Sequence, residues 1–209
     1  MINNVPFVRN PDEWHCIHAA MKGVLEHFAR RHYSLDYLNA LMNSRHNLWV
    51  WPIQAAKVLS EEGLFVRLFT GMDLKSFKPE FIRSSFPSYA DLTDYSTLSD
   101  GISYVLEKGI YEKRNLSISE IERLIYDGCV PIVILGSKKH LGKYVTLTGF
   151  DSNNFYFHDS GPLKPQPHRK ISKEKFLRKW SEAPSLNSVI VVFGKEYNGS
   201  YIRFHFSNT

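Results

Sequence analysis

The hydrophobic positions in the first third of the chain recur with the period of an α-helix. Over about 13–30, five apolar residues share one helical face, namely Ile17, Ala20, Met21, Val24 and Phe28. Ser34 is a suitable N-cap for a short second helix. Pro52 suits the first turn of a third helix that ends before Gly63. The alternation over 64–69 then predicts a strand.

The pattern is weaker in the middle of the chain, where 73–84 and 97–107 have helical spacing. Ser117 precedes a glutamate by three positions and stands ahead of an apolar run, which is the pattern of a capping box. It predicts a helix that ends near Gly128. A last short helix is expected over 172–180.

After Gly128 the pattern changes to short runs rich in Val, Ile, Phe and Tyr. These runs predict strands over 130–135, 144–150, 154–158 and 188–193. A polar turn over 151–154 predicts a hairpin, and 201–206 is expected to add a final strand. Helices that precede an antiparallel sheet define an α+β fold, with the N-terminal helices packed on the C-terminal sheet.

Length and composition fit one domain over 1–209, because 43% of the 209 residues are hydrophobic and can form a core. No run approaches the roughly 20 apolar residues of a membrane-spanning helix. The N-terminus lacks the apolar segment of a signal peptide. Two cysteines, Cys16 and Cys129, are too few for a disulfide framework. We therefore expect a cytoplasmic protein without a membrane span.

The net charge of +5 is mild, but basic residues concentrate in 164–179, which holds one acidic residue, Glu174. This stretch suits an acidic peptide, an anionic lipid or a nucleic acid, or else it is a solvated loop and helix face. No zinc-finger spacing or ribonucleoprotein motif accompanies the charge. We therefore do not expect nucleic-acid binding.

Two segments about 125 residues apart read as halves of one site. The first is Val-Pro-Phe-Val-Arg-Asn over 5–10, with Cys16 six residues after Asn10. The second is Gly-Lys-Tyr-Val-Thr-Leu-Thr-Gly-Phe-Asp over 142–151, followed by Phe-Tyr-Phe-His-Asp-Ser-Gly-Pro over 155–162. Together they resemble the bacteriocin-leader-processing cysteine peptidases. That resemblance implies a papain-like fold and a divergent, free-standing relative.

The resemblance also implies roles for individual residues. Cys16 matches the nucleophile, and Asn10 stands where the family has a glutamine that stabilises the oxyanion. Asp159 matches the carboxylate that orients a catalytic histidine, but Lys143 occupies the histidine position itself. Ile17 follows the cysteine where relatives carry glycine. The departures therefore gather at the implied site.

Elementary chemistry sets what these residues can do. A thiol at a helix N-terminus is expected to have a lowered pKa, because the helix dipole favours the thiolate. A lysine needs its pKa depressed by about 3 units to act as a base at pH 7. Lys143 otherwise serves as an ammonium that holds the thiolate. His140, three residues upstream, is the alternative base, whereas strand alternation turns His158 away from Asp159.

No cofactor or metal is expected. His15 and His18 are three positions apart, but no third ligand accompanies them. Two hypotheses therefore remain open. The first is a thiol-dependent hydrolase or acyl transferase that acts on a peptide-type carbonyl. The second is a catalytically degenerate module that binds a peptide or protein partner. The tryptophans Trp14, Trp49 and Trp51 either line a groove or belong to the core.

Overall fold

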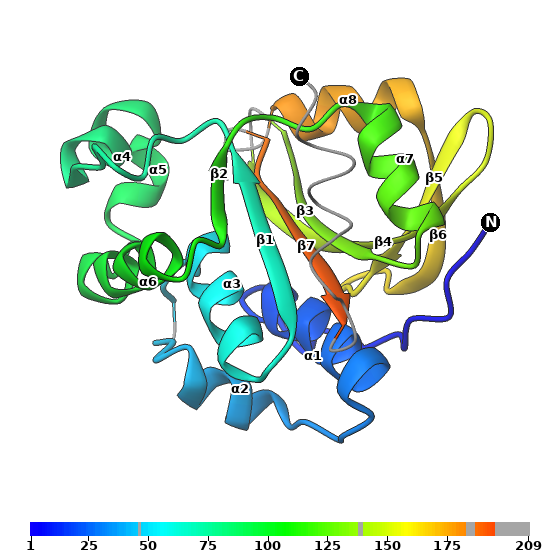
Figure 1. Ribbon diagram of the computed structural model, residues 1–209, viewed down its shortest axis with the longest axis horizontal. Coiled ribbons are helices and arrows are strands. Elements are labelled where there is room, and N and C mark those ends of the chain that lie inside the picture. The colour runs from blue at the N-terminus through cyan, green and yellow to red at the C-terminus, as the bar shows by residue number, and fades with distance from the viewer. Residues whose placement is uncertain (46, 138–139, 183–186, 195–209) are drawn as a thin grey trace.

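The computed structural model describes residues 1–45, 47–137, 140–182 and 187–194. The side chains of 137–141 are not described. The strand expected over 201–206 lies outside the described residues. Seven strands form one mixed sheet, and helices cover both of its faces (Figure 1). Among the described residues no helix has the length and hydropathy needed to cross a membrane.

The three helices expected in the first third are present as α1 (Cys16–Ala29), α2 (Leu35–Leu41) and α3 (Pro52–Glu61). The first helix begins at Cys16, three residues later than the start expected near residue 13. There the Asp12 carboxylate accepts the N–H groups of Trp14 and His15 at 2.7 and 3.0 Å and forms a turn before the helix. Cys16 is consequently the first residue of α1.

The sheet has the order β2-β1-β7-β3-β4-β5-β6. Its strands are β1 (Phe65–Thr70), β2 (Tyr111–Lys113), β3 (Val130–Ser137), β4 (His140–Phe150), β5 (Asn154–Asp159), β6 (Gln166–Ser172) and β7 (Val189–Gly194). All described pairings are antiparallel except β1 with β2, so the expected antiparallel sheet is mixed at one edge. A helical crossover connects those two strands, which permits parallel pairing.

The sequence pattern missed β2 and β6. β2 has three residues, and β6 is an edge strand whose side chains are mostly exposed and polar, so neither carries an apolar signal. The first half of the basic stretch 164–179 is therefore a strand and its second half is a helix.

The remaining helices are α4 (Pro79–Ser85), α5 (Pro87–Ala90), α6 (Tyr95–Glu107), α7 (Ile118–Tyr126) and α8 (Lys173–Ser181). The capping box at Ser117 is present and begins α7. The helix expected over 73–84 is wrong in its first half, because Asp73 accepts N–H groups from the next residues and closes a turn. α4 begins only at Pro79.

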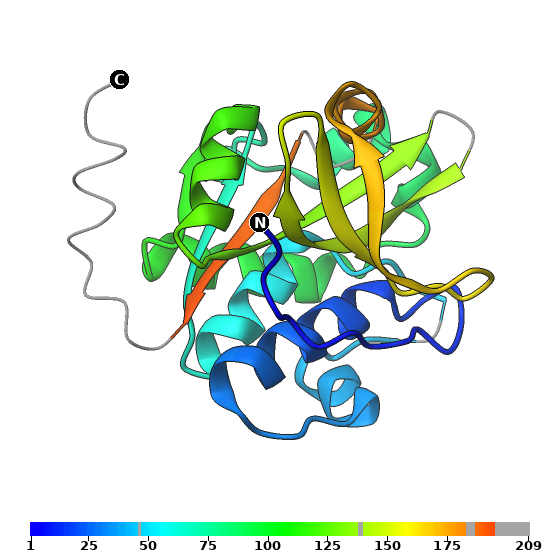
Figure 2. The ribbon, with the colours of Figure 1, turned by 90° about the vertical axis from the view of Figure 1, so that its right-hand side faces the viewer.

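Two hydrophobic clusters lie on opposite faces of the sheet. α1 and α3 pack on one face with Met21, Leu25 and Leu59, whereas α7 and α8 pack on the other with Phe155 and Phe176. Figure 2 shows the N-terminal segment running along α1 to the loop that follows β5.

The N-terminal segment 1–10 is attached to the sheet by backbone hydrogen bonds. Asn3 N–H donates to the Thr148 carbonyl at 2.6 Å, and Asn10 N–H donates to the Ser160 carbonyl at 2.8 Å. A Cβ on Gly23 of α1 would lie 2.6 Å from the Pro6 carbonyl oxygen. The segment therefore lies directly on α1, which places Asn10 near Cys16.

Candidate active site

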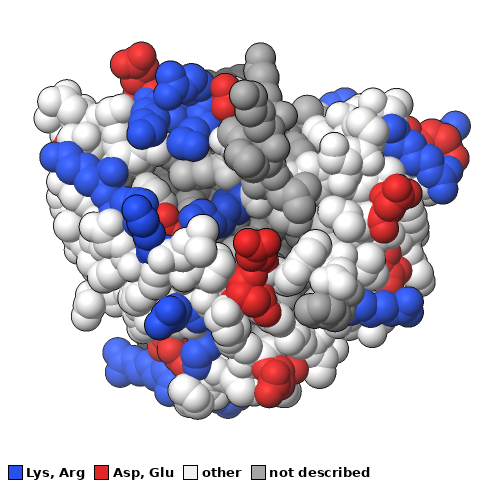
Figure 3. Space-filling model, turned by 180° about the vertical axis from the view of Figure 1, so that it is seen from behind, with Lys and Arg blue, Asp and Glu red and all other residues white. Residues whose placement is uncertain are grey.

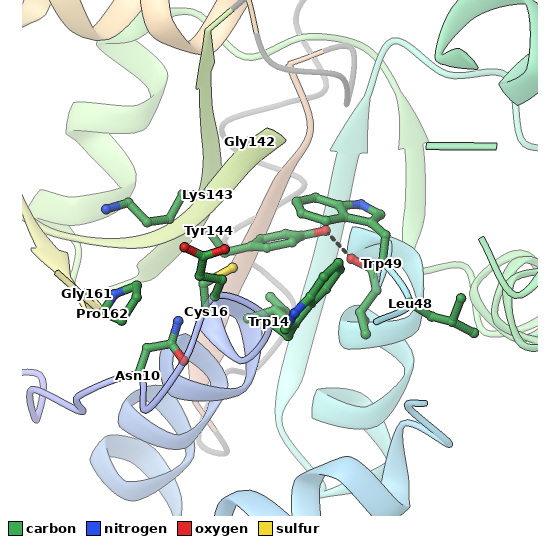
Figure 4. A pocket seen from close by; sticks show the side chains of 13 residues that line it. Asn10, Trp14, Cys16, Leu48, Trp49, Gly142, Lys143, Tyr144, Gly161 and Pro162 are labelled. Carbon is green, nitrogen blue, oxygen red and sulfur yellow. Dashed lines mark hydrogen bonds between the residues drawn. The ribbon is translucent and has the colours of Figure 1, made fainter. Parts of the chain in front are cut away.

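Cys16 lines a cavity of about 370 Å³ between the start of α1, the start of β4 and the loop after β5. Figure 4 shows its sulfur between Asn10, Lys143 and Trp14. The two segments that the sequence placed 125 residues apart therefore meet at one cavity. Asn10, Cys16 and Lys143 all line it.

Burial dominates the acidity of the thiol. It raises the pKa of Cys16, although N–H groups of Tyr144 and Ile17 and the charge of Lys143 act in the opposite direction. The lowered pKa expected from the helix N-terminus is therefore not found, because the 5% exposed side chain loses more solvation than the donors restore. The resting thiol is protonated at neutral pH.

Asn10, which lines the cavity, carries a buried donor without a partner in the described part of the chain. Its Oδ1 accepts the Asp12 N–H at 3.2 Å, which fixes the orientation of the amide, since only the oxygen can accept. Its Nδ2 has no partner among the described residues, although Asn10 is only 1% exposed. Figure 4 shows this nitrogen turned toward the side of the cavity where Cys16 lies.

Lys143 forms an ion pair with Asp159, the two residues that the resemblance matches to the base and to the carboxylate that orients it. The second carboxylate oxygen lies 3.3 Å from Nε of Arg169 on β6, a residue that sequence reasoning did not place at the site. Figure 4 shows the Lys143 side chain extending away from the Cys16 sulfur. In this conformation the ammonium is directed to Asp159, so it influences the thiol through its charge.

Aromatic side chains form one wall of the cavity. Trp49 stacks on Tyr144 with ring centroids 5.4 Å apart and meets Tyr89 edge-on at 5.0 Å. The Tyr144 hydroxyl donates to the Val50 carbonyl at 2.7 Å, and the Tyr89 hydroxyl accepts the Gly142 N–H at 2.8 Å. These bonds hold the loop before α3 and the helix α5 against the start of β4. Trp49 therefore belongs to the wall of the cavity.

No histidine among the described side chains lines this cavity. The side chain of His140, the alternative base, lies outside the description. His158 donates from Nε2 to the Val5 carbonyl at 2.8 Å and accepts the His168 N–H at Nδ1, so both its nitrogens are engaged. Burial also lowers the pKa of His158, which keeps it neutral. His158 fastens the N-terminal segment.

His15 and His18 line a second, smaller cavity of about 130 Å³ that shares Trp14 with the first. His15 is held between Asp12 at 2.6 Å and Asn39 at 2.9 Å. Both ring nitrogens of His18 lack a partner among the described residues, and burial lowers the pKa of His18 to about 3. Within the described chain no group of three or more His, Cys, Asp and Glu is arranged to hold a metal.

Comparison with solved structures identifies the fold. No protein-family model and no curated protein matches the chain. The peptidase domain of Streptococcus ComA, a bi-functional ABC transporter involved in a quorum-sensing pathway, matches with 18% identity over 90% of this chain and 96% of that one, at a TM-score of 0.51. A C39-like peptidase candidate from Bacillus anthracis matches with 14% identity over 91% of this chain and 94% of that one, at 0.55. The chain therefore has the papain-like fold of the C39 cysteine peptidase domains.

Proposed function

We propose that the protein is a thiol-dependent hydrolase or acyl transferase that acts on a peptide-type carbonyl, with Cys16 as the nucleophile. One observation carries this proposal: Cys16 and Asn10 line the same cavity, and the Nδ2 of Asn10 is a buried donor without a partner among the described residues. A buried donor without an acceptor costs about 1–3 kcal/mol. The cost is recovered when a carbonyl oxygen that becomes an oxyanion occupies the cavity.

The geometry supports a two-step acyl transfer. The Cys16 thiol first loses its proton to solvent, which alkaline conditions favour. The resulting thiolate attacks the carbonyl carbon, and the electron pair of the C=O bond moves to the oxygen. Asn10 Nδ2 and the N–H groups at the first turn of α1 donate to that oxyanion. The C–N bond then breaks, the amine leaves with a proton, and a thioester on Cys16 remains for water or another acceptor to cleave.

Lys143 supplies the charge and the proton in this scheme. Among the described residues of the cavity it is the only cation, and its charge lowers the pKa of the thiol against the larger effect of burial. Its flexible stem lets the ammonium move from Asp159 toward the leaving amine and protonate it. The neutral amine of Lys143 then takes a proton from the water that cleaves the thioester. Asp159, which also pairs with Arg169, holds the ammonium between turnovers.

A second candidate function is peptide binding without catalysis. The ion pair between Lys143 and Asp159, which directs the ammonium away from the thiol, favours it. The protonated state of Cys16 at neutral pH favours it too. The aromatic wall and the cavity volume suit a peptide in either case.

The test is cleavage of a library of internally quenched peptides, assayed between pH 7 and 10. We expect cleavage by the wild type and none by Cys16→Ala. Asn10→Ala is expected to lower kcat about 10²–10³-fold with little change in KM, because the donor acts on the oxyanion. Cys129→Ala is the matched control, since this second buried thiol lies in the other hydrophobic cluster and its removal leaves the cavity intact.

Cleavage that survives Cys16→Ala would refute the assignment of the nucleophile. If no library peptide is cleaved at any pH, yet peptides bind to wild type and to Cys16→Ala alike, the binding function replaces the hydrolytic one.

A further inference from the structure

A third cavity, of about 370 Å³, shares Lys143 with the cavity at Cys16. Five basic side chains line it, and we call it the cationic cleft: Lys143, Arg169, Lys170, Lys175 and Lys179. They come from β4, β6 and α8. Figure 3 shows Lys and Arg side chains gathered around a hollow on this face of the molecule.

The charges of the cationic cleft are incompletely balanced. Asp159 is the only carboxylate among the described residues that line it, and Lys143 and Arg169 share that group. Lys170 lies 3.8 Å from the Asp151 carboxylate, which is outside the cleft. Lys175 and Lys179 have no carboxylate partner in the described part of the chain. Four residues apart on α8, they repel each other mildly, so an anion between them is stabilising.

The floor of the cationic cleft is apolar. Leu135 and Val145 come from the sheet interior, and Phe157 and Ile171 extend the floor toward the edge strand. A hollow with an apolar floor and a basic rim suits a chain whose side chains carry methylene groups and terminal carboxylates. Stacked bases need a row of exposed aromatic rings, whereas Phe157 is the only aromatic residue among the described lining and is buried.

The position of the cleft connects it to the chemistry of Cys16. Lys143 lines both cavities, although Cys16 belongs to the hydrophobic cluster on the α1 face of the sheet and the cleft floor to the cluster on the α7 and α8 face. A polypeptide whose carbonyl lies at Cys16 would therefore reach the cationic cleft by passing the Lys143 side chain from one face to the other. An acidic side chain there would also compete with Asp159 for the Lys143 ammonium. Release from Asp159 frees the ammonium to approach the thiol.

We propose that the cationic cleft binds acidic side chains of the peptide that enters the Cys16 cavity. The link to Cys16 rests on the proposed function, whereas the binding itself does not. The cleft thus selects peptides with Asp or Glu a few residues from the reacting carbonyl. The attraction is between opposite charges and is screened by salt.

The binding experiment uses fluorescein-labelled peptides that differ only in charge. One carries four Glu residues beside a neutral six-residue segment, and the other has Gln at those four positions. Every protein carries Cys16→Ala, so that binding is measured by anisotropy without chemistry. We expect the Glu peptide to bind at least tenfold more tightly than the Gln peptide at 50 mM NaCl, and this preference to shrink at 300 mM.

The variant that tests the cleft is Lys175→Glu/Lys179→Glu. Its matched control is Lys164→Glu/Arg178→Glu, which makes the same charge change within the same basic stretch at exposed residues outside the cleft. We expect the cleft variant to lose the preference for the Glu peptide, and the control to keep it within threefold. Circular dichroism and thermal unfolding verify that both variants fold.

If the cleft variant and the control lose the preference for the Glu peptide equally, the proposal is overturned, because net charge alone would then explain the preference. Inorganic phosphate, added at matched ionic strength, gives a second test. If phosphate displaces the Glu peptide at a concentration below the Kd of that peptide, the proposal is overturned and the cleft is assigned to a small anion. If peptides are also cleaved, the cleft variant should raise KM for the Glu peptide. Absence of cleavage with intact Glu-peptide binding refutes only the proposed catalysis.

Discussion

The thiol of Cys16 and the ammonium of Lys143 depend on each other for their charge states. Burial raises the pKa of the thiol, and the Lys143 charge opposes that effect. Asp159 holds the ammonium by an ion pair at the edge of the cavity. The reactive combination of thiolate and ammonium therefore forms in a small fraction of molecules at neutral pH, and alkaline conditions favour it.

This balance predicts the pH dependence of alkylation by iodoacetamide in a Cys129→Ala background. The thiolate is the reacting form, so the alkylation rate of a free thiol levels off near its pKa of about 8.5. For the buried Cys16 the alkylation rate should still rise tenfold per pH unit at pH 8.5. Lys143→Ala should be several-fold slower throughout, since the opposing charge is gone. A plateau below pH 8, or a faster Lys143→Ala variant, would contradict this account. Cys129 itself should be inert, because burial raises the pKa of Cys129 to about 12.

Replacement of Lys143 by histidine should create a better base. An imidazole with a pKa near 6.5 removes the thiol proton at pH 7, and Asp159 lies where it can orient the ring. Lys143→His is expected to raise kcat at pH 7 about 10²–10⁴-fold on a peptide that the wild type cleaves. Lys143→Arg is the control, since it keeps the charge but cannot act as a base. Equal rates for both variants would show that the proton is transferred elsewhere.

At the scale of elements, the site depends on how the N-terminal segment lies on α1. The segment reaches its place through its contacts with Thr148, His158 and Ser160, which belong to β4, β5 and the following loop. α1 adds a close approach at Gly23, where the absence of a Cβ leaves room for the Pro6 carbonyl. Asn10 and Cys16 are thus held by different elements that must pack closely.

A matched pair of alanine substitutions tests this packing. Gly23→Ala and Gly101→Ala both fill a helix interior and gain about 1 kcal/mol of helix propensity. The new methyl on residue 23 meets a backbone oxygen at 2.6 Å, whereas on residue 101 it meets the Cγ2 methyl of Ile53 at 3.3 Å, which needs a shift of only a few tenths of an ångström. Urea unfolding should therefore show Gly23→Ala less stable than wild type by about 1–3 kcal/mol and Gly101→Ala unchanged or more stable. Similar stabilities for the two variants would refute the close approach.

At the scale of the whole molecule, buried neutral histidines make the fold sensitive to acid. Burial is the largest cause that lowers the pKa of His18, to about 3, and the neighbouring His15 acts in the same direction. Burial likewise lowers the pKa of His158 and of His27. In the unfolded chain the pKa of these histidines returns to about 6.5. The unfolded chain therefore binds protons that the folded chain excludes.

The free energy of unfolding is therefore expected to be flat between about pH 7 and 8 and to fall as the pH drops from 6.5 toward 3. His18 alone contributes a loss of about 2 kcal/mol by pH 5, at 1.36 kcal/mol per pKa unit. Urea unfolding at pH 7.5 and 5.0 measures it. His18→Gln, which cannot titrate, should lose less stability than wild type over the same interval. An identical loss in the variant would place the acid sensitivity in other groups.

Sequence reasoning was most successful where one segment carries its own signal. The Ser34 cap and the capping box at Ser117 were predicted from local patterns and are present, because each satisfies N–H groups within three residues of itself. β6 was missed because an edge strand with exposed polar side chains has no apolar period. Arg169 was missed with it, since only the pairing of β6 with β5 brings this residue to Asp159.

By itself, the sequence determined the order of helices and strands, the nucleophile candidate and the departure at Lys143. These properties are local or lie in motifs that are read along the chain. The tertiary structure decided the charge state of Cys16 and the free donor of Asn10, because burial depends on elements far apart in sequence. It also decided that the basic residues of β6 and α8 share a hollow with Lys143. Solvation and electrostatic energies depend on distances in space, which a linear pattern does not contain.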